Sequence, residues 1–200
     1  MSPILKTAAG NRENQDRGAI LRIAAGFVLV VTDGAGGISG ATEAAMMAIQ
    51  LAQGGVEKLR DSATCAALLQ AMDRSIADDS KAGETTCALA VVTGDQIFGA
   101  SVGDSGIWII GPNKVTNLTE TRKPFIGSGG AFPAPFEQRR IAGDTLLLAT
   151  DGLLKYTSAE RIAAICREND PEQAAGRLIE AVRYPSGTLP DDVTVILAKL

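Results

Sequence analysis

Histidine is absent from this sequence of 200 residues. Its absence excludes three classes of site: Ser-His-Asp hydrolases, phosphoryl relays through histidine, and zinc sites with histidine ligands. Any chemistry carried out by this chain must therefore depend on carboxylates, hydroxyl groups, cationic side chains or a metal ion.

Cysteine is scarce, and the three cysteines form no CxxC pair. Cys65, Cys87 and Cys166 each lie in an apolar run, which is typical of buried thiols in a reducing compartment. An excess of basic charge is also missing, because the formal net charge is −4. This balance argues against nucleic acid or an anionic membrane as the main partner, and it leaves basic peptides open.

Long apolar runs are missing as well. No stretch reaches the roughly 18 residues that a membrane-spanning helix needs. Residues 1–6 lack the basic and apolar segments of a signal peptide. We therefore expect a cytoplasmic protein with no membrane partner. A hydrophobic content of 46% is enough for one sizeable core, so we predict one domain over residues 1–200.

Short apolar runs alternate with turn residues along the chain. Their β-branched and apolar composition predicts strands over residues 19–24, 27–32, 85–92, 96–102, 107–110, 145–150 and 193–197. The three middle runs are separated by short turns, as in a meander of hairpins. Residues 121–137 are rich in glycine and proline and predict an irregular flap or surface loop.

Apolar residues at helical spacing indicate four helices. The first includes residues 44–51 and ends at residues 54–55, and the second includes residues 65–76. Two closing helices have start signals at Thr157 and Asp170. Two groups of strands, each accompanied by a helix pair, predict an α+β fold in which helices flank a β-sandwich on both outer faces.

Five aspartates stand at strand ends or in turns: Asp16, Asp33, Asp104, Asp151 and Asp191. A single aspartate in a turn usually bonds to the local backbone, so none of the five is informative alone. Asp33, Asp104 and Asp151 each follow a mostly apolar run, which places their carboxylates at the same kind of sheet edge. Clustered carboxylates repel one another unless cations lie between them, and all-oxygen ligation selects hard ions such as Mg²⁺ or Mn²⁺.

Six short segments follow one another along the chain: NQD at 14–16, VTDGAGG at 31–37, GETT at 83–86, VGDS at 102–105, LATDGL at 148–153 and DDVT at 191–194. In this order they resemble the motifs of PPM-type (type 2C) metal-dependent serine/threonine phosphatases, in a short bacterial-like form. The resemblance implies a four-layer α-β-β-α sandwich. It also implies hydrolysis of phosphoserine and phosphothreonine in proteins, in opposition to a serine/threonine kinase.

The resemblance further implies a set of metal ligands. Asp33 would bridge two Mn²⁺ or Mg²⁺ ions, with the backbone carbonyl of Gly34 on one ion and with Asp151 and Asp191 on the other. Asp104 would share Asp151 at a third, weaker metal position. A water activated between the two ions would attack phosphorus directly.

Two further residues complete the implied site. Asp16 would hold water of the metal site, and Arg12 would bind the substrate phosphate. Arg12 stands four residues before Asp16, where the family more often has five. Many eukaryotic members carry a histidine directly after the D-G pair, and bacterial members commonly carry one after the two glycines. This chain has Ala35 and Ile38 at those positions. Gln15 replaces the usual glutamate.

Three other interpretations compete with a phosphatase. Residues 34–39 could form a dinucleotide-binding turn, but Ser39 replaces the third glycine of GxGxxG and no convincing acidic partner for a ribose follows. Residues 103–106 are similar to the nucleophile segment of trypsin-like proteases, which requires a histidine base. A catalytically silent PPM-like domain that binds phosphoproteins stays open, and hydrolysis of nitrophenyl phosphate would distinguish it from an enzyme.

Overall fold

The computed structural model of the chain describes residues 2–35, 39–168 and 170–200. One group of strands consists of β2 Asp16–Ile23, β3 Gly26–Asp33, β4 Cys87–Val92, β5 Gln96–Val102 and β8 Ala134–Arg139. The other group consists of β1 Ile4–Ala8, β6 Gly106–Ile110, β7 Val115–Asn117, β9 Thr145–Ala149 and β10 Val193–Lys199. The helices are α1 Ala41–Gly55, the 3₁₀ turn η1 Val56–Lys58, α2 Ser62–Ala77, α3 Asp151–Leu154, α4 Ala159–Cys166 and α5 Pro171–Glu180.

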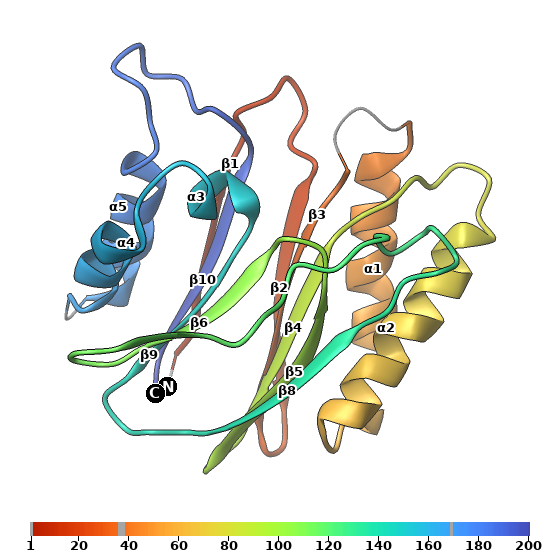
Figure 1. The fold of residues 1–200 in the computed structure, drawn as a ribbon, viewed down its shortest axis with the longest axis horizontal. Coiled ribbons are helices and arrows are strands. Elements are labelled where there is room, and N and C mark those ends of the chain that lie inside the picture. The colour runs from red at the N-terminus through yellow and green to blue at the C-terminus, as the bar shows by residue number, and fades with distance from the viewer. Residues whose placement is uncertain (1, 36–38, 169) are drawn as a thin grey trace.

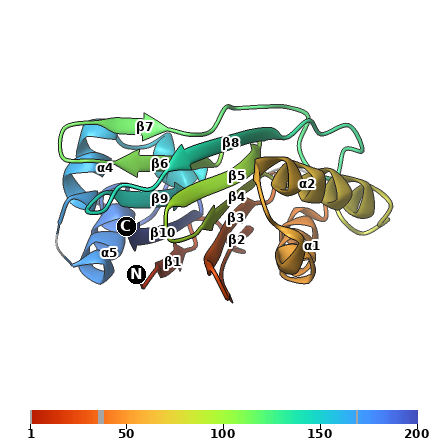
Figure 2. The same cartoon turned by 90° about the horizontal axis from the view of Figure 1, so that it is seen from below.

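The strands form two antiparallel sheets that lie face to face (Figure 1). The order is β2-β3-β4-β5-β8 in the first sheet and β1-β10-β9-β6-β7 in the second. Helices α1 and α2 cover the outer face of the first sheet, and α4 and α5 cover the outer face of the second (Figure 2). The predicted α-β-β-α sandwich is therefore confirmed.

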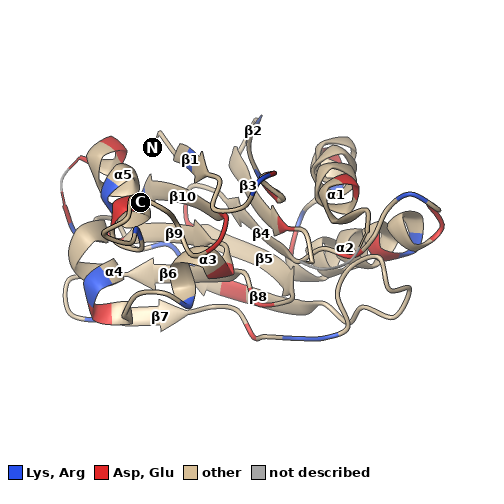
Figure 3. Ribbon diagram, turned by 90° about the horizontal axis from the view of Figure 1, so that it is seen from above, with Lys and Arg blue, Asp and Glu red and all other residues tan. Residues whose placement is uncertain are grey.

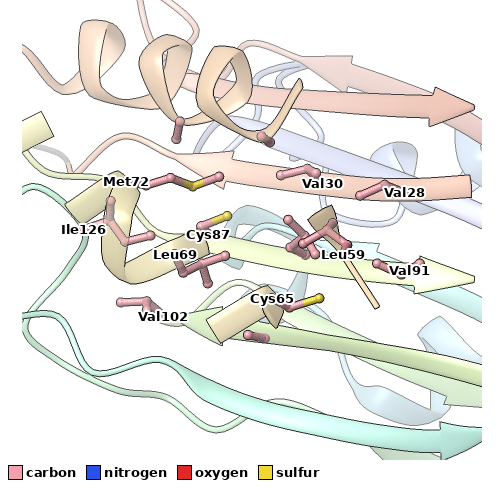
Figure 4. Close-up of a cluster of buried hydrophobic side chains, with 14 of the residues drawn as sticks. Val28, Val30, Leu59, Cys65, Leu69, Met72, Cys87, Val91, Val102 and Ile126 are labelled. Atoms are coloured by element: carbon pink, nitrogen blue, oxygen red, sulfur yellow. The ribbon is translucent and has the colours of Figure 1, made fainter. Parts of the chain in front are cut away.

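Strand β3 contributes to two cores at once. Val28 and Val30 pack beneath α1 and α2 (Figure 4), while Leu29 and Val31 pack against the second sheet. All four residues are fully buried. A strand that is buried on both faces has a continuous apolar sequence, which is why this strand was predictable. Its burial also holds the end of β3, at Asp33, in a fixed place.

Five short elements were not predicted: β1, β7, β8, η1 and α3. Strand β8 lies within residues 121–137, so the expectation of an irregular loop is wrong for the last part of that range. It is an edge strand that, among the described strands, pairs with β5 alone, with Pro135 opposite Ala100. Proline is tolerated at such an edge because no second neighbour needs its missing N–H.

The predicted meander is wrong at its third strand. Strand β4 pairs with β5 as expected, but β6 lies in the other sheet between β7 and β9. Residues 103–105 therefore cross from one sheet to the other. Gly103 makes this crossing possible, because its φ of 95° suits glycine and because a Cβ there would approach Thr86 to 2.6 Å.

The helix boundaries agree with the capping signals, with one correction. Helix α5 starts at the predicted cap, where the Asp170 carboxylate accepts the N–H groups of Glu172 and Gln173. Helix α4 is capped by Ser158, one residue after the predicted Thr157, because the Ser158 hydroxyl accepts the N–H of Arg161. No helix in the described part of the chain is long and apolar enough to cross a membrane.

Candidate metal centre

Three of the predicted aspartates meet between the two sheets at one end of the sandwich. Asp33 ends β3, Asp104 lies in the crossing turn after β5, and Asp151 begins α3. One carboxylate oxygen of each lies within 4.8 Å of the other two. Figure 3 is a view of the molecule from this end, where acidic positions gather around α3. The fold thus joins carboxylates that are far apart in the sequence.

The three carboxylates line a pocket of about 780 Å³. Asp191 and Gly34 line the same pocket, so the structure brings together all five residues that were predicted as metal ligands.

Asp16 lies directly behind this pocket. It begins β2 and is paired in register with Asp33 on β3. Its side chain is buried, and its Oδ2 accepts the hydroxyl of Thr150 at 2.7 Å. Its Oδ1 has no hydrogen-bond partner among the described residues. A buried carboxylate oxygen without a donor is energetically costly, so this atom is free to accept a further hydrogen bond.

Burial and mutual repulsion disfavour the ionised forms of Asp33 and Asp16. Burial raises the pKa of Asp33 well above its ordinary value of 3.8, and the charges of Asp16 and Asp151 raise the pKa further. Burial is also the main reason why the pKa of Asp16 is raised. A cation placed among the carboxylates removes this cost. Because every donor is an oxygen, the residues fit a hard divalent ion such as Mg²⁺ or Mn²⁺.

Asp192 holds the N-terminal loop against the centre, a role that sequence reasoning missed. Its Oδ1 accepts the N–H groups of Gly10 and Asn11 at 2.8 and 3.0 Å, and its Oδ2 accepts the N–H of Gln15 at 2.8 Å. Asp191 lines the pocket together with Asp192, and the Oδ1 of Asp191 accepts the side-chain amide of Asn11 at 2.9 Å. In the sequence, the adjacent acidic pair of the DDVT segment was the signal that could have revealed this role of Asp192.

Threonine hydroxyls connect the strands beneath the centre. Thr86 accepts the backbone N–H of Asp33 at 3.1 Å, and its hydroxyl bonds to that of Ser105 at 2.7 Å. Thr85 donates to the carbonyl of Asp33 at 2.9 Å. These bonds connect the end of β3 to the crossing turn and limit movement of Asp33.

The chain matches a family model described as stage II sporulation protein E (SpoIIE) over residues 24–200. The chain belongs to the SpoIIE family. No curated protein sequence matches it.

Solved structures show the fold that this SpoIIE-family chain adopts. A bacterial serine phosphatase is 19% identical, with a TM-score of 0.87 over 99% of this chain and 97% of that one. The Staphylococcus aureus phosphatase Stp1 is 20% identical, with a TM-score of 0.85 over 99% and 94%. The catalytic domain of the phosphatase PstP, in complex with two manganese ions, is 21% identical, with a TM-score of 0.82 over 99% and 97%. The likeness establishes the PPM phosphatase fold.

Arg12 lies on the exposed N-terminal loop, before the residues that match the SpoIIE model. It does not line the pocket, although Asn11 and Gln15 on the same loop do. Its role as a phosphate ligand stays a prediction. Ala35 lines the pocket, whereas Ile38, the other position considered for an acid, lies outside the described residues together with residues 36–37.

A buried carboxylate on α2 holds the flap that borders the pocket. Asp73 is 3% exposed, and it accepts the backbone N–H groups of Gly127, Gly129 and Ala131 at 2.8, 3.0 and 3.0 Å. Residues 123–125 line the pocket immediately before this anchored segment. Asp73 therefore positions one wall of the pocket from outside it.

Replacing Asp73 with alanine should lower the free energy of unfolding by about 2 to 4 kcal/mol, because several N–H groups lose a charged acceptor. Hydrogen exchange of the amides in residues 127–131 should accelerate more than elsewhere. Denaturation and exchange measurements check both effects. Asp78→Ala, an exposed change at the end of the same helix, is the control. Unchanged exchange in Asp73→Ala would contradict the anchoring role.

Proposed function

We propose that this chain is a metal-dependent phosphatase that hydrolyses phosphoserine and phosphothreonine in proteins. The observation that carries the proposal is the convergence of the Asp33, Asp104 and Asp151 carboxylates in a pocket. Membership of the SpoIIE family and the PPM fold support it, since solved phosphatases share this fold.

The proposed cofactor is Mn²⁺ or Mg²⁺. Asp33 would lie between two ions, with the Gly34 carbonyl on one ion and with Asp151 and Asp191 on the other. The complex of PstP with two manganese ions supports this assignment. Ions bound in this way would bring the pKa of water close to neutrality and would polarise the phosphate, which supplies a nucleophile without histidine.

The protein's own residues would orient the reactants. The unpartnered Oδ1 of Asp16, beside Asp33, would accept a hydrogen bond from water and fix its direction. Arg12 would bind two phosphate oxygens through its guanidinium, a geometry that suits arginine. Asn11, the residue before it, lines the pocket, which supports this assignment.

The proposed substrate is a phosphorylated protein that a serine/threonine kinase has modified. The acidic pocket and the net charge of −4 are compatible with a basic sequence around the phosphorylated residue. We place the enzyme in the cytoplasm, with neither nucleic acid nor a membrane as a partner.

Chelation is the decisive test of this function. The purified protein should hydrolyse a phosphothreonine peptide with added Mn²⁺ or Mg²⁺, and EDTA should abolish turnover while the circular dichroism spectrum is retained. Turnover should return when excess Mn²⁺ is added. Activity that survives thorough chelation would overturn the metal mechanism.

The rival function, a silent phosphoprotein-binding module, has a distinct outcome in the same assay. Such a module would bind Mn²⁺ and a phosphopeptide, yet would hydrolyse neither the peptide nor nitrophenyl phosphate. The aspartates that line the pocket, with Asp16 buried beside Asp33, favour the enzyme.

A further inference from the structure

Lys155 places its ammonium group against two carboxylates of the candidate metal centre. Its Nζ lies 2.9 Å from Oδ2 of Asp104 and also donates to Oδ2 of Asp151. Lys155 follows Asp151 by four residues, and this spacing brings an acid and a following lysine together on a helical turn. These are the two carboxylates to which the family resemblance assigns a third metal position.

Charge, not burial, keeps Lys155 in this place. Its side chain is 55% exposed, so packing does not force it toward the centre. The side chains of Asp104 and Asp151 are 22% and 13% exposed, and they offer acceptors that a lone lysine on the surface would lack. A divalent ion at the same place would have to displace the ammonium or lie beside a like charge, which is unfavourable at such short range.

We propose that Lys155 is a built-in cation that takes the place of a third metal ion, so that the centre holds two divalent ions. The inference rests on the proposed function only in treating the cluster as a metal centre. Lys155 is then a positioning residue, because it orients Asp104 and Asp151 and neutralises part of their charge. The family's weaker metal position would be occupied by the protein itself.

A second lysine in the same pocket provides a matched control. Lys123 lines the pocket, and its Nζ lies 5.0 Å from the centre of the Phe125 ring. It forms no ion pair within the described ranges. Removing its charge changes the field of the pocket without freeing a carboxylate. If Lys155 instead bound the substrate phosphate, Lys155→Met would raise KM without changing the number of bound ions.

The test is the stoichiometry of Mn²⁺ binding by titration calorimetry and equilibrium dialysis. Wild type should bind two ions per chain, Lys155→Met should bind three, and Lys123→Met should bind two. Asp104→Asn in the Lys155→Met background should remove the added ion. Lys155→Gln, which loses the same charge but keeps a polar side chain, should also bind three ions, and circular dichroism should show that every variant is folded.

Two ions in both wild type and the Lys155 variants would overturn the inference and leave the proposed function intact. Three ions in wild type would also overturn it. No Mn²⁺ binding by wild type would instead overturn the metal centre itself, and the proposed function with it.

Discussion

Asp33→Asn should lower kcat/KM for a phosphothreonine peptide by more than about 100-fold, and Mn²⁺ binding should be lost. Changing a group that only supports a metal ligand typically costs about 10- to 100-fold. Asp33 would contact both ions, so the loss of activity in Asp33→Asn should exceed that range. Asp104→Asn should lower kcat/KM by about 10-fold or less, because Asp104 is peripheral to the two ions and Lys155 already pairs with it.

Calorimetry and steady-state kinetics check this order, with Asp95→Asn as a control for an exposed aspartate in a distant turn. We do not expect unfolding to cause the loss of activity and Mn²⁺ binding in Asp33→Asn. Asparagine at residue 33 removes a crowded carboxylate, so the metal-free variant should be at least as stable as metal-free wild type. A severe loss of Mn²⁺ affinity in Asp104→Asn but not in Asp33→Asn would contradict the assignment of the bridging ligand.

Most of the strands that the sequence revealed are buried on both faces. Residues 27–32 and 96–102 are nearly continuous apolar runs, and both form central strands. Strand β8 gave no such signal, because its exposure alternates and Pro135 interrupts the pattern. The jump of the chain between sheets at residues 103–105 was equally hidden, because pairing partners are set by tertiary packing and not by the pattern of a single strand.

The residues of the candidate site also fall into two groups, those that the local sequence reveals and those that only the folded chain reveals. Asp33, Asp104 and Asp151 were predictable because each follows an apolar run, so that local sequence places it at a strand end. Asp192 and Asp73 were not, because each accepts N–H groups from a loop that is distant in the sequence. Only the folded chain shows that these two carboxylates support loops beside the pocket.

The absence of histidine from this chain affects how the leaving group is expelled. A serine alkoxide leaves poorly without a proton, and a positioned general acid contributes about 10² to 10⁴ in rate. Nitrophenolate leaves readily on its own. The wild-type enzyme, which has no histidine, should therefore prefer nitrophenyl phosphate to a phosphoserine peptide. Its kcat/KM should not fall as the pH rises through ~6.5, the ordinary pKa at which a histidine acid would lose its proton.

Ala35→His tests whether an acid can be restored at this pocket. Ala35 lines the pocket and its N–H bonds to the carbonyl of Glu84 at 2.9 Å, so the backbone would hold a new side chain at the site. The ratio of kcat/KM for the phosphoserine peptide to that for nitrophenyl phosphate should rise by about 10- to 100-fold, within the range of a general acid. Ala35→Asn adds a polar side chain that cannot transfer a proton in this way, and it should leave the ratio unchanged. An unchanged ratio in folded, metal-loaded Ala35→His would show that proton donation does not limit the reaction.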